Sequence, residues 1–295
     1  MSDAVGPIPV IEGLSSVADR YDVILCDIWG VLHDGVRAFA ATGDALNRFR
    51  AKGGTVILIS NAPRPGPEVL PLLDGLGVRR DAYDDIITSG DVARRSIAQH
   101  GNDPLFHLGP ERDLPLFQGL HARLVPVEDA RYVVCTGLFD DNHETPEHYR
   151  DQFEAMQARN LAMICANPDL VVERGHHLIY CAGALAALYE ALGGTVTYAG
   201  KPHRPIYDAA FELASKVRRA PIDANRVLAV GDAIRTDVAG AAAMGIDALF
   251  VSRGIHAREF ADPTGTLDTG ALGRWIVEQS HHPAMMIDMV RWSAA

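Results

Sequence analysis

The 295-residue sequence lacks the features that would assign it to a membrane or secreted class. No apolar run approaches the ~20 residues that a helix needs to cross a bilayer. The first residues, MSDAVGPIPVIEGL, have neither a basic start nor a long apolar stretch, so we expect no secretion signal. These absences predict a cytoplasmic protein that has no membrane as a partner.

The chain is also poor in basic residues. Lys and Arg total 27 against 38 Asp and Glu, which gives a formal net charge of −11. Nucleic acids are bound by clusters of Lys and Arg, so we expect no nucleic-acid partner. An acidic protein that handles an anionic substrate needs local compensation from a metal ion or from a few well-placed cations.

Cysteine is scarce, and the positions of the four residues do not suggest a disulfide framework. The four cysteines are widely spaced, and each lies in an apolar segment: Cys26, Cys135, Cys165 and Cys181. This spacing indicates buried thiols in a reducing compartment and argues against a disulfide scaffold or a zinc site.

The segment 21–35, YDVILCDIWGVLHDG, is the most informative part of what is present. Its apolar run, 23–26, is too short for a helix and ends at a carboxylate, Asp27, before a turn that contains Gly30. Ligands of open α/β sheets bind at the carboxyl ends of the strands. Asp27 is therefore the candidate nucleophile.

Short apolar strands alternate with amphipathic helices along most of the chain. We expect strands at 55–60, 105–108, 132–136, 162–166, 195–199, 226–230 and 248–252. We expect helices at 42–52, 68–76, 145–156, 182–192 and 206–217, with Thr42 and Thr145 as N-caps and a weakly helical tail after Arg258. The alternation predicts an α/β protein with a parallel sheet, and the length allows two domains.

Polar side chains follow four of these strands. In chain order they are Asp27, Ser60 with Asn61, Lys201, and Asp232 with Asp237. Each alone could be a turn residue, a helix cap or a surface lysine. At the strand ends of one sheet they supply the parts of phosphoryl transfer: a carboxylate nucleophile, acidic oxygens for Mg²⁺, and a hydroxyl, an N–H group and a lysine for phosphate.

These motifs resemble those of the haloacid dehalogenase superfamily, in particular its class IIA (NagD-like) phosphatases. The matching segments are DIWGVL from Asp27, Ser60-Asn61 where relatives commonly have Thr-Asn, Gly200-Lys201-Pro202, and GDAIRTD at 231–237. The resemblance covers nearly the whole chain, and the last motif is the most specific.

The resemblance implies an α/β fold with a HAD-like Rossmannoid parallel-sheet core and an inserted α/β cap domain of the class IIA type. The core would comprise residues 1–88 and 197–295, and the cap residues 89–196. The cap would close over the substrate and supply specificity. Five cap residues are candidates to face the site, although each alone is a typical surface or turn residue: His143, Asn167, Asp169, His176 and His177.

The resemblance also implies roles for the motif residues. Mg²⁺ would be held by Asp27, the main-chain carbonyl of Trp29 and Asp232, with Asp237 supporting the metal site. Ser60, Asn61 and Lys201 would bind phosphate, and Lys201 would also act in catalysis. The implied reaction is Mg²⁺-dependent hydrolysis of a small phosphorylated metabolite, such as a sugar, nucleotide or aryl phosphate. Whether the chain forms a homo-oligomer stays open.

One position departs from the family pattern: Trp29 stands where hydrolases of this family carry a second aspartate that acts as general acid and base. Such help is worth roughly 10²–10⁴-fold in rate. Three interpretations are open. His33 or Asp34 replaces the acid; or the substrate has a leaving group that needs little protonation, such as an aryl or acyl phosphate; or the protein binds phosphorylated ligands with little turnover. Trp29 could also simply pack against the cap.

Two unrelated folds fit less well. A two-component receiver domain has its acids ahead of the phosphorylated aspartate, whereas here acids return near the end of a chain that is too long for one receiver. A nucleotide-binding fold needs G-x-G-x-x-G after a strand or G-x-x-x-x-G-K-[ST], and neither motif is present.

Overall fold

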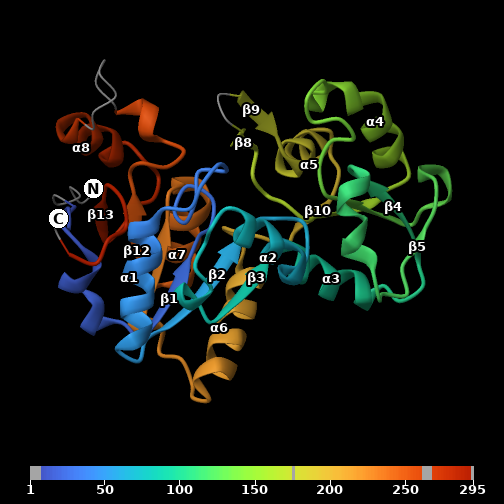
Figure 1. Cartoon of the computed structure of the whole chain (residues 1–295). Coiled ribbons are helices and arrows are strands. Elements are labelled where there is room, and N and C mark those ends of the chain that lie inside the picture. The colour runs from blue at the N-terminus through green and yellow to red at the C-terminus, as the bar shows by residue number, and fades with distance from the viewer. Residues whose placement is uncertain (1–7, 175–176, 261–267, 294–295) are drawn as a thin grey trace. The chain divides into compact units, whose positions relative to one another are not determined.

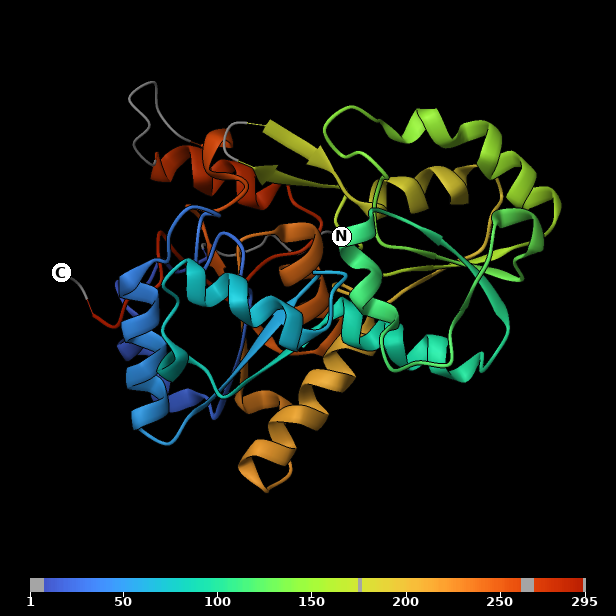
Figure 2. The same ribbon diagram turned by 45° about the vertical axis from the view of Figure 1, so that its right-hand side comes forward.

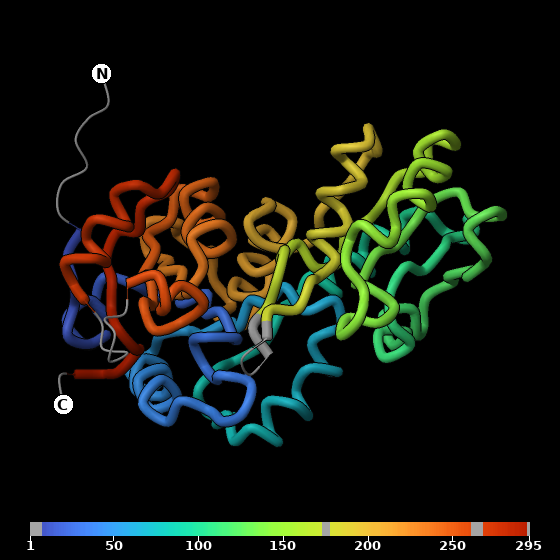
Figure 3. The backbone as a smooth tube through the Cα atoms, turned by 90° about the horizontal axis from the view of Figure 1, so that it is seen from above, coloured from blue at the N-terminus to red at the C-terminus, as the bar shows by residue number. Residues whose placement is uncertain are grey.

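The computed structural model describes residues 8–174, 177–260 and 268–293. The chain divides into two compact units. Unit 1 comprises Met1–Ile59, Leu72–Ile86 and Tyr207–Ala295, and unit 2 comprises Ser60–Pro71 and Ile87–Ile206. Figure 3 shows the blue N-terminal and the orange to red C-terminal segments together in unit 1, and the green and yellow-green segments in unit 2.

A six-stranded sheet organises unit 1, in the order β13-β12-β11-β1-β2-β3. Its strands are β1 (Val23–Cys26), β2 (Thr55–Ser60), β3 (Asp85–Thr88), β11 (Val227–Gly231), β12 (Asp247–Val251) and β13 (Met285–Ile287). The last residues of β2 and β3 already count with unit 2. Strand β1 pairs in parallel with both β2 and β11, and its four residues are fully buried, as expected for a strand covered on both faces.

Helices cover both faces of this sheet. Helix α1 (Ala40–Ala51) lies on one face, and α6 (Arg204–Arg218) and α7 (Ala239–Met244) lie on the other (Figures 1 and 3). Helix α2 (Gly66–Gly75) connects β2 to β3, and α8 (Thr269–Val277) precedes β13. The prediction of Thr42 as an N-cap is wrong: α1 begins two residues earlier, and the buried Thr42 hydroxyl donates to the carbonyl of Val290 at 3.2 Å.

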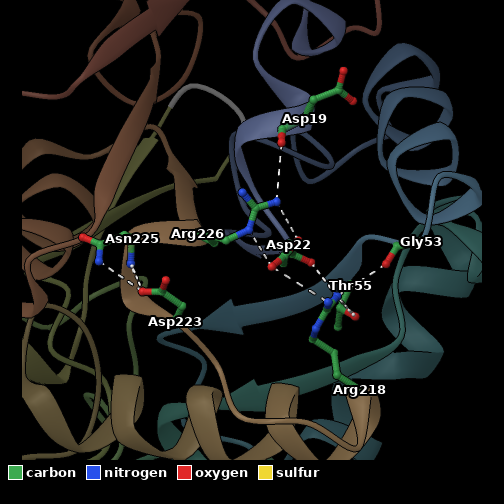
Figure 4. A network of polar contacts seen from close by, with 8 residues as sticks. All are labelled: Asp19, Asp22, Gly53, Thr55, Arg218, Asp223, Asn225 and Arg226. Carbon is green, nitrogen blue, oxygen red and sulfur yellow. Dashed lines mark hydrogen bonds and ion pairs between the residues drawn. The ribbon is translucent and has the colours of Figure 1, made fainter.

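Ion pairs tie the amino ends of the central strands together (Figure 4). Arg226, just before β11, donates from Nε and Nη2 to the two carboxylate oxygens of Asp22, just before β1, at 2.7 and 2.8 Å. Arg218 donates to the main-chain oxygen of Asp22 at 3.0 Å. This two-pronged geometry is the strong form of an arginine–carboxylate contact, and it fixes how β1 and β11 begin.

Unit 2 is built on a five-stranded parallel sheet, in the order β10-β7-β6-β4-β5 (Figure 2). The strands are β4 (Pro104–Leu108), β5 (Arg123–Leu124), β6 (Tyr132–Cys135), β7 (Ala162–Cys165) and β10 (Val196–Tyr198). Helices α4 (Arg150–Ala158) and α5 (Ala182–Ala191) lie on one face and α3 (Ser89–Gln99) on the other (Figures 1 and 2). A separate antiparallel hairpin joins β8 (Val171–Arg174) and β9 (His177–Tyr180).

The core of unit 2 forms where α4 and α5 meet the sheet. Phe153 of α4 and Tyr189 of α5 are fully buried against residues of β6 and β7. Thr145 is confirmed as an N-cap: it precedes a short 3₁₀ turn, Pro146–Tyr149, that leads into α4, and its N–H group donates to Nδ1 of His148 at 2.8 Å. All four cysteines are buried and free, as predicted.

The parallel α/β architecture is confirmed, but the strands differ from expectation in two respects. Strand β10 belongs to the sheet of unit 2, so Lys201 follows a strand of the second sheet and the four polar strand ends do not belong to one sheet. The pairing of a three-residue edge strand depends on its neighbour β7, which no local pattern specifies. Strands β3, β5, β8, β9 and β13 were not predicted; β13, for example, is a run of three apolar residues, which is too short to signal a strand.

Within the described ranges, no helix combines the length and apolarity needed to cross a membrane.

Candidate active site

Three buried aspartates gather at the carboxyl ends of the central strands of unit 1. Asp27 directly follows β1, and Asp232 directly follows β11. Because Cys26 pairs with Val230 in the parallel register, the two acids come to the same edge of the sheet. Asp237 lies in the π-helical turn that follows β11. Carboxylate oxygens of the three residues lie within 4.8 Å of one another, and each residue is at most 8% exposed.

Main-chain contacts and glycines shape the surroundings of Asp232. Its Oδ2 accepts the N–H group of Ile255 at 2.7 Å. A Cβ atom at Gly30 or at Gly254 would clash with the Asp232 carboxylate. Gly30 also has a φ of +78°, which only glycine adopts at little cost. Glycine at both positions therefore lets the backbone come close to this carboxylate.

Asp237 is oriented by the same turn. Its Oδ2 accepts the N–H group of Ala233 at 3.2 Å, and a Cβ atom at Gly231 would clash with its side chain. The turn that carries GDAIRTD thus folds back so that its last acid lies beside its first.

The donor set of this cluster fits a hard divalent cation. Buried carboxylates so close together repel one another, and a bound cation removes that repulsion. Mg²⁺ and Ca²⁺ both prefer carboxylate oxygens, and three such groups are gathered here. The main-chain carbonyl of Trp29 as a further ligand stays a prediction from the resemblance.

The two sequence candidates for a replacement acid lie in the turn after Trp29. His33 is 1% exposed, and its Nδ1 accepts the N–H group of Gly35 at 3.0 Å, so its neutral ring carries the proton on Nε2. Burial lowers the pKa of His33, against a smaller opposing effect of Asp34. At neutral pH this side chain is a buried neutral imidazole, which is a weak proton donor.

Asp34 is tied into its own turn. Its Oδ1 accepts the N–H groups of Val36 and Arg37 at 2.9 and 2.8 Å. Burial acts to raise the pKa of Asp34, but the backbone hydrogen bonds from Arg37 and Val36 and the Arg37 charge outweigh it, so the pKa lies below its usual value. An ionised carboxylate that closes a turn is poorly suited to donate a proton to a leaving group.

Trp29 is partly exposed, and its ring packs against residues of its own turn. The residue is 36% exposed, and the next residue, Gly30, lies against Asp232. The indole meets His33 edge-on, with ring centroids 5.0 Å apart. A Cβ atom at Gly35, which has a φ of +85°, would lie 2.8 Å from the indole. Two residues of the same turn therefore hold the ring in place.

Within unit 2, Asn61 binds the backbone of Lys201. Its Oδ1 accepts the Lys201 N–H group at 2.7 Å, and its Nδ2 donates to the Lys201 carbonyl at 3.2 Å and to Asp169 Oδ1 at 2.8 Å. Asn61 and Lys201 are both buried. The preceding residue, Ser60, ends β2, and its Oγ accepts the N–H group of Ala62 at 3.2 Å. The structure thus brings the second and third sequence motifs together.

Two residues near Asn61 and Lys201 have surroundings that the sequence did not reveal. Ser89, the first residue of α3, is fully buried, and among the described residues its Oγ finds no hydrogen-bond partner. A Cβ atom at Gly200 would clash with Asn61 and lie 2.8 Å from Ser89 Oγ. Asp169, predicted as a turn residue, is a direct partner of Asn61. Only the folded arrangement shows either contact, because the residues are far apart in sequence.

The other cap candidates have local roles. Asn167 is buried, and its Oδ1 accepts the N–H group of Asp169 at 3.1 Å. His143 pairs with Asp140 at 2.7 Å on the surface. His176 lies outside the described residues, and the structure gives no side-chain description for His177.

Comparisons with known proteins identify relatives for both halves of the chain. Residues 24–122 match a family model described as haloacid dehalogenase-like hydrolase, and residues 198–269 match one described as HAD-hydrolase-like. The crystal structure of a hydrolase of the haloacid dehalogenase-like family from Brucella suis 1330 is 47% identical in sequence. The match covers 95% of this chain and 100% of that one, with a TM-score of 0.84.

Two comparisons involve phosphatases from Mycobacterium tuberculosis. A D-glycerol 3-phosphate phosphatase is 27% identical over 261 residues, which cover 82% of this chain and 66% of that protein. The crystal structure of a glycerol phosphate phosphatase in complex with calcium is 23% identical, covers 91% of this chain and 77% of that one, and has a TM-score of 0.64. At this identity the second match shows a shared fold.

Proposed function

Because the chain belongs to the haloacid dehalogenase superfamily, in its class IIA branch, we propose that it is a metal-dependent phosphatase that hydrolyses a small phosphorylated metabolite through an aspartyl-phosphate on Asp27. The similarity to a D-glycerol 3-phosphate phosphatase supports activity as a phosphoric monoester hydrolase. The cluster of Asp27, Asp232 and Asp237 is the observation that carries the proposal, because it brings the proposed nucleophile together with two further acids that could hold a cation.

The proposed reaction has two steps on Asp27. A carboxylate oxygen of Asp27 forms a bond to phosphorus, the ester P–O bond breaks, and the leaving oxygen takes up a proton. Water then attacks the phosphorus of the aspartyl-phosphate, which releases inorganic phosphate and restores the carboxylate. The position of Asp27 at the end of a fully buried strand holds the nucleophile in place for both steps.

We propose Mg²⁺ as the cation, held by Asp27, Asp232 and the main-chain carbonyl of Trp29, with Asp237 in support. When bound, the ion neutralises negative charge between the carboxylates and the substrate phosphate. The contacts from Ile255 to Asp232 and from Ala233 to Asp237 would keep two of these acids oriented in its presence or absence.

We propose Ser60, Asn61 and Lys201 as the phosphate-binding residues. The Lys201 ammonium would neutralise charge on the transferring group. The side-chain amide of Asn61 already binds the Lys201 backbone and Asp169, so its contribution is largely to position Lys201. Residues 89–196 stay the proposed specificity domain, and their separate hydrophobic core supports that division.

The test is phosphate release from 4-nitrophenyl phosphate by the purified protein with Mg²⁺. Asp27→Asn should reduce the rate to background, because the amide is not a nucleophile for phosphorus. Asp22→Asn, at the opposite end of β1, is the matched control and should keep the rate. Equal activity of Asp27→Asn and the wild type would rule out the nucleophile assignment.

A second function, binding of phosphorylated ligands with little turnover, is favoured by one observation: Trp29 stands where the family acid is expected. In that case phosphate release stays at background while inorganic phosphate raises the melting temperature only in the presence of Mg²⁺. Measuring both quantities on one preparation separates the two functions.

A further inference from the structure

Unit 2 contains a pocket at the carboxyl end of strand β4. Its volume is about 520 Å³, which lies within the ~300–1,000 Å³ range of small-molecule sites. Its walls come from β4, from the segments 109–114 and 124–126, and from Phe139, which follows β6. Among the described residues that line it, none belongs to the proposed metal or phosphate set. The proposed reaction therefore leaves this pocket without a role.

Strand β4 is where the order of strands in this sheet reverses. The chain runs from β4 to β5 at the edge and then returns to β6, β7 and β10 on the opposite side of β4. In open α/β sheets, ligands bind outside the carboxyl ends of the strands at such a reversal. The pocket is lined by residues that follow both β4 and β6, so it occupies the position at which this class of sheet binds ligands.

His107, near the end of β4, is the uncharged polar side chain of the pocket, and its Nε2 lies 2.9 Å from Oγ1 of Thr136. Burial raises the pKa of Asp113, against the charges of two arginines and a hydrogen bond from the Thr136 hydroxyl. Because this hydroxyl donates to Asp113, it accepts from Nε2–H of His107. Burial lowers the pKa of His107 to about 4, so the ring is neutral at neutral pH. Its Nδ1 is then an acceptor, and within the described ranges it has no hydrogen-bond partner.

Apolar side chains form most of the remaining walls, and several of them are open to solvent. Leu114, Leu124 and Phe139 are 42%, 43% and 47% exposed. Large apolar side chains that are exposed together are typical of a binding surface. The rings of Phe106 and Phe139 meet edge-on, with centroids 6.5 Å apart, and aromatic walls pack well against flat rings.

The charge of the pocket argues against a phosphorylated ligand. No Lys or Arg is among the described residues that line it, and Glu111 is its charged side chain. An anion would leave water without meeting an opposite charge. Glu111 is exposed, so its carboxylate stays hydrated and attracts a cation only weakly. These walls therefore favour an uncharged molecule.

We infer that this pocket binds an uncharged, flat heteroaromatic molecule whose ring N–H group donates to Nδ1 of His107. The apolar walls match the faces of such a ring, and His107 supplies an acceptor for its donor. The site goes beyond the proposed function, because it involves neither Asp27 nor a metal ion.

The experiment measures the Kd values of three probes for the full-length protein by isothermal titration calorimetry: indole, 1-methylindole and indole-3-carboxylate. All three share one ring system, but 1-methylindole lacks the donor and indole-3-carboxylate carries a negative charge. Indole should bind, and 1-methylindole should bind roughly 2–12-fold more weakly, the range expected for loss of one hydrogen bond. Indole-3-carboxylate should bind at least roughly tenfold more weakly than indole, because no cation meets its charge.

Two variants locate the site. Leu124→Asp places a charge in the apolar wall and should abolish indole binding. Leu72→Asp, at a leucine of α2 that is 42% exposed, is the matched control and should keep it. In His107→Phe, indole and 1-methylindole should bind with the same Kd, because the acceptor is gone. Should His107→Phe fail to fold, the comparison of the two probes on the wild type still tests the contact.

Three outcomes would overturn the inference. The first is equal binding of indole and 1-methylindole by the wild type. The second is indole binding that survives Leu124→Asp, which would place the ligand elsewhere. The third is a dimer that dissociates in Leu124→Asp while the wild type binds no indole, which would assign this surface to a second copy of the chain. None of these measurements involves phosphate release, so each result leaves the proposed function as it stands.

Discussion

The two ends of strand β1 carry the same residue type in opposite settings. At the amino end, the side chain of Asp22 is 38% exposed and faces Arg226, with Arg218 on its backbone (Figure 4). At the carboxyl end, Asp27 is buried and faces two further aspartates. The strand between them is only four residues long. What surrounds an aspartate, and not the aspartate itself, decides whether it ties strands together or joins a cluster of acids.

The side chains at the two ends of β1 contribute to the stability of the fold with opposite signs. An exposed ion pair such as Asp22 with Arg226 stabilises the fold only slightly, because water screens the two charges. Three carboxylates buried together destabilise it, because their charges repel and are withdrawn from water. A bound cation would offset this cost at the carboxyl end, so the proposed function would couple to stability there and not at the amino end.

The comparison is tested most strongly by neutralising one acid at each end. Asp232→Asn should lower phosphate release by roughly 10²–10³-fold, because the cation loses a charged ligand. Asp223→Asn, which removes an exposed acid that caps a turn in the amino-end network, should leave the rate within about twofold of the wild type. Steady-state rates at saturating Mg²⁺ decide it, and equal losses would contradict the division between the two ends.

Metal addition should stabilise the protein only through the carboxyl end. At a free Mg²⁺ concentration about 100-fold above its Kd, the free energy of unfolding should rise by about 2.7 kcal/mol. The measurement is urea unfolding with and without Mg²⁺, with a chelator to reverse the effect. A gain of the same size in Asp232→Asn would place the ion elsewhere.

Two glycines with positive φ sharpen the comparison further. Gly30→Ala should destabilise the protein by about 1–3 kcal/mol and impair activity, because the backbone is strained and the new Cβ clashes with Asp232. Gly53 has a φ of +90° at the amino end but nothing within 4 Å of an added Cβ, so Gly53→Ala should cost about 1 kcal/mol and spare activity. Thermal melts and rates on both variants check this, and loss of activity in Gly53→Ala would contradict it.

The smallest effect is a pH dependence at the amino end. The hydrogen bonds from Arg226 hold the pKa of Asp22 below its usual value, although burial opposes them. The stabilisation is therefore complete above the unfolded pKa of about 3.9 and is lost as the pH falls through the lower folded value. Asp22→Asn should reduce the free energy of unfolding by up to about 1 kcal/mol near neutral pH and by less near pH 2. A difference that grows toward low pH would refute the assignment.

The sequence predicted the parts of this picture that local pattern encodes. Buried strands such as Thr55–Ser60 are continuous apolar runs, and the acids at the ends of β1 and β11 follow such runs directly, so Asp27 and Asp232 could be placed at strand ends from sequence. The structure then brings the two together through the register of neighbouring strands.

Contacts between distant segments could not be predicted. The sheet to which β10 belongs depends on packing within unit 2, and the binding of Lys201 by Asn61 joins residues 140 positions apart. The setting of Trp29 depends on a turn whose glycine conformation and buried histidine leave no periodic signal. Such features depend on side-chain geometry, which composition and spacing do not encode.

The contact between Asn61 and Lys201 has a consequence for how such a chain can diversify. The side-chain amide of Asn61 joins the two ends of a loop that contains nearly the whole of unit 2. The position of Lys201 is therefore set by a contact at the ends of that loop. The length and sequence of the chain between the two residues can change, provided that the contact between Asn61 and Lys201 forms. Related chains could thus differ over most of unit 2 and still hold a lysine at the same point.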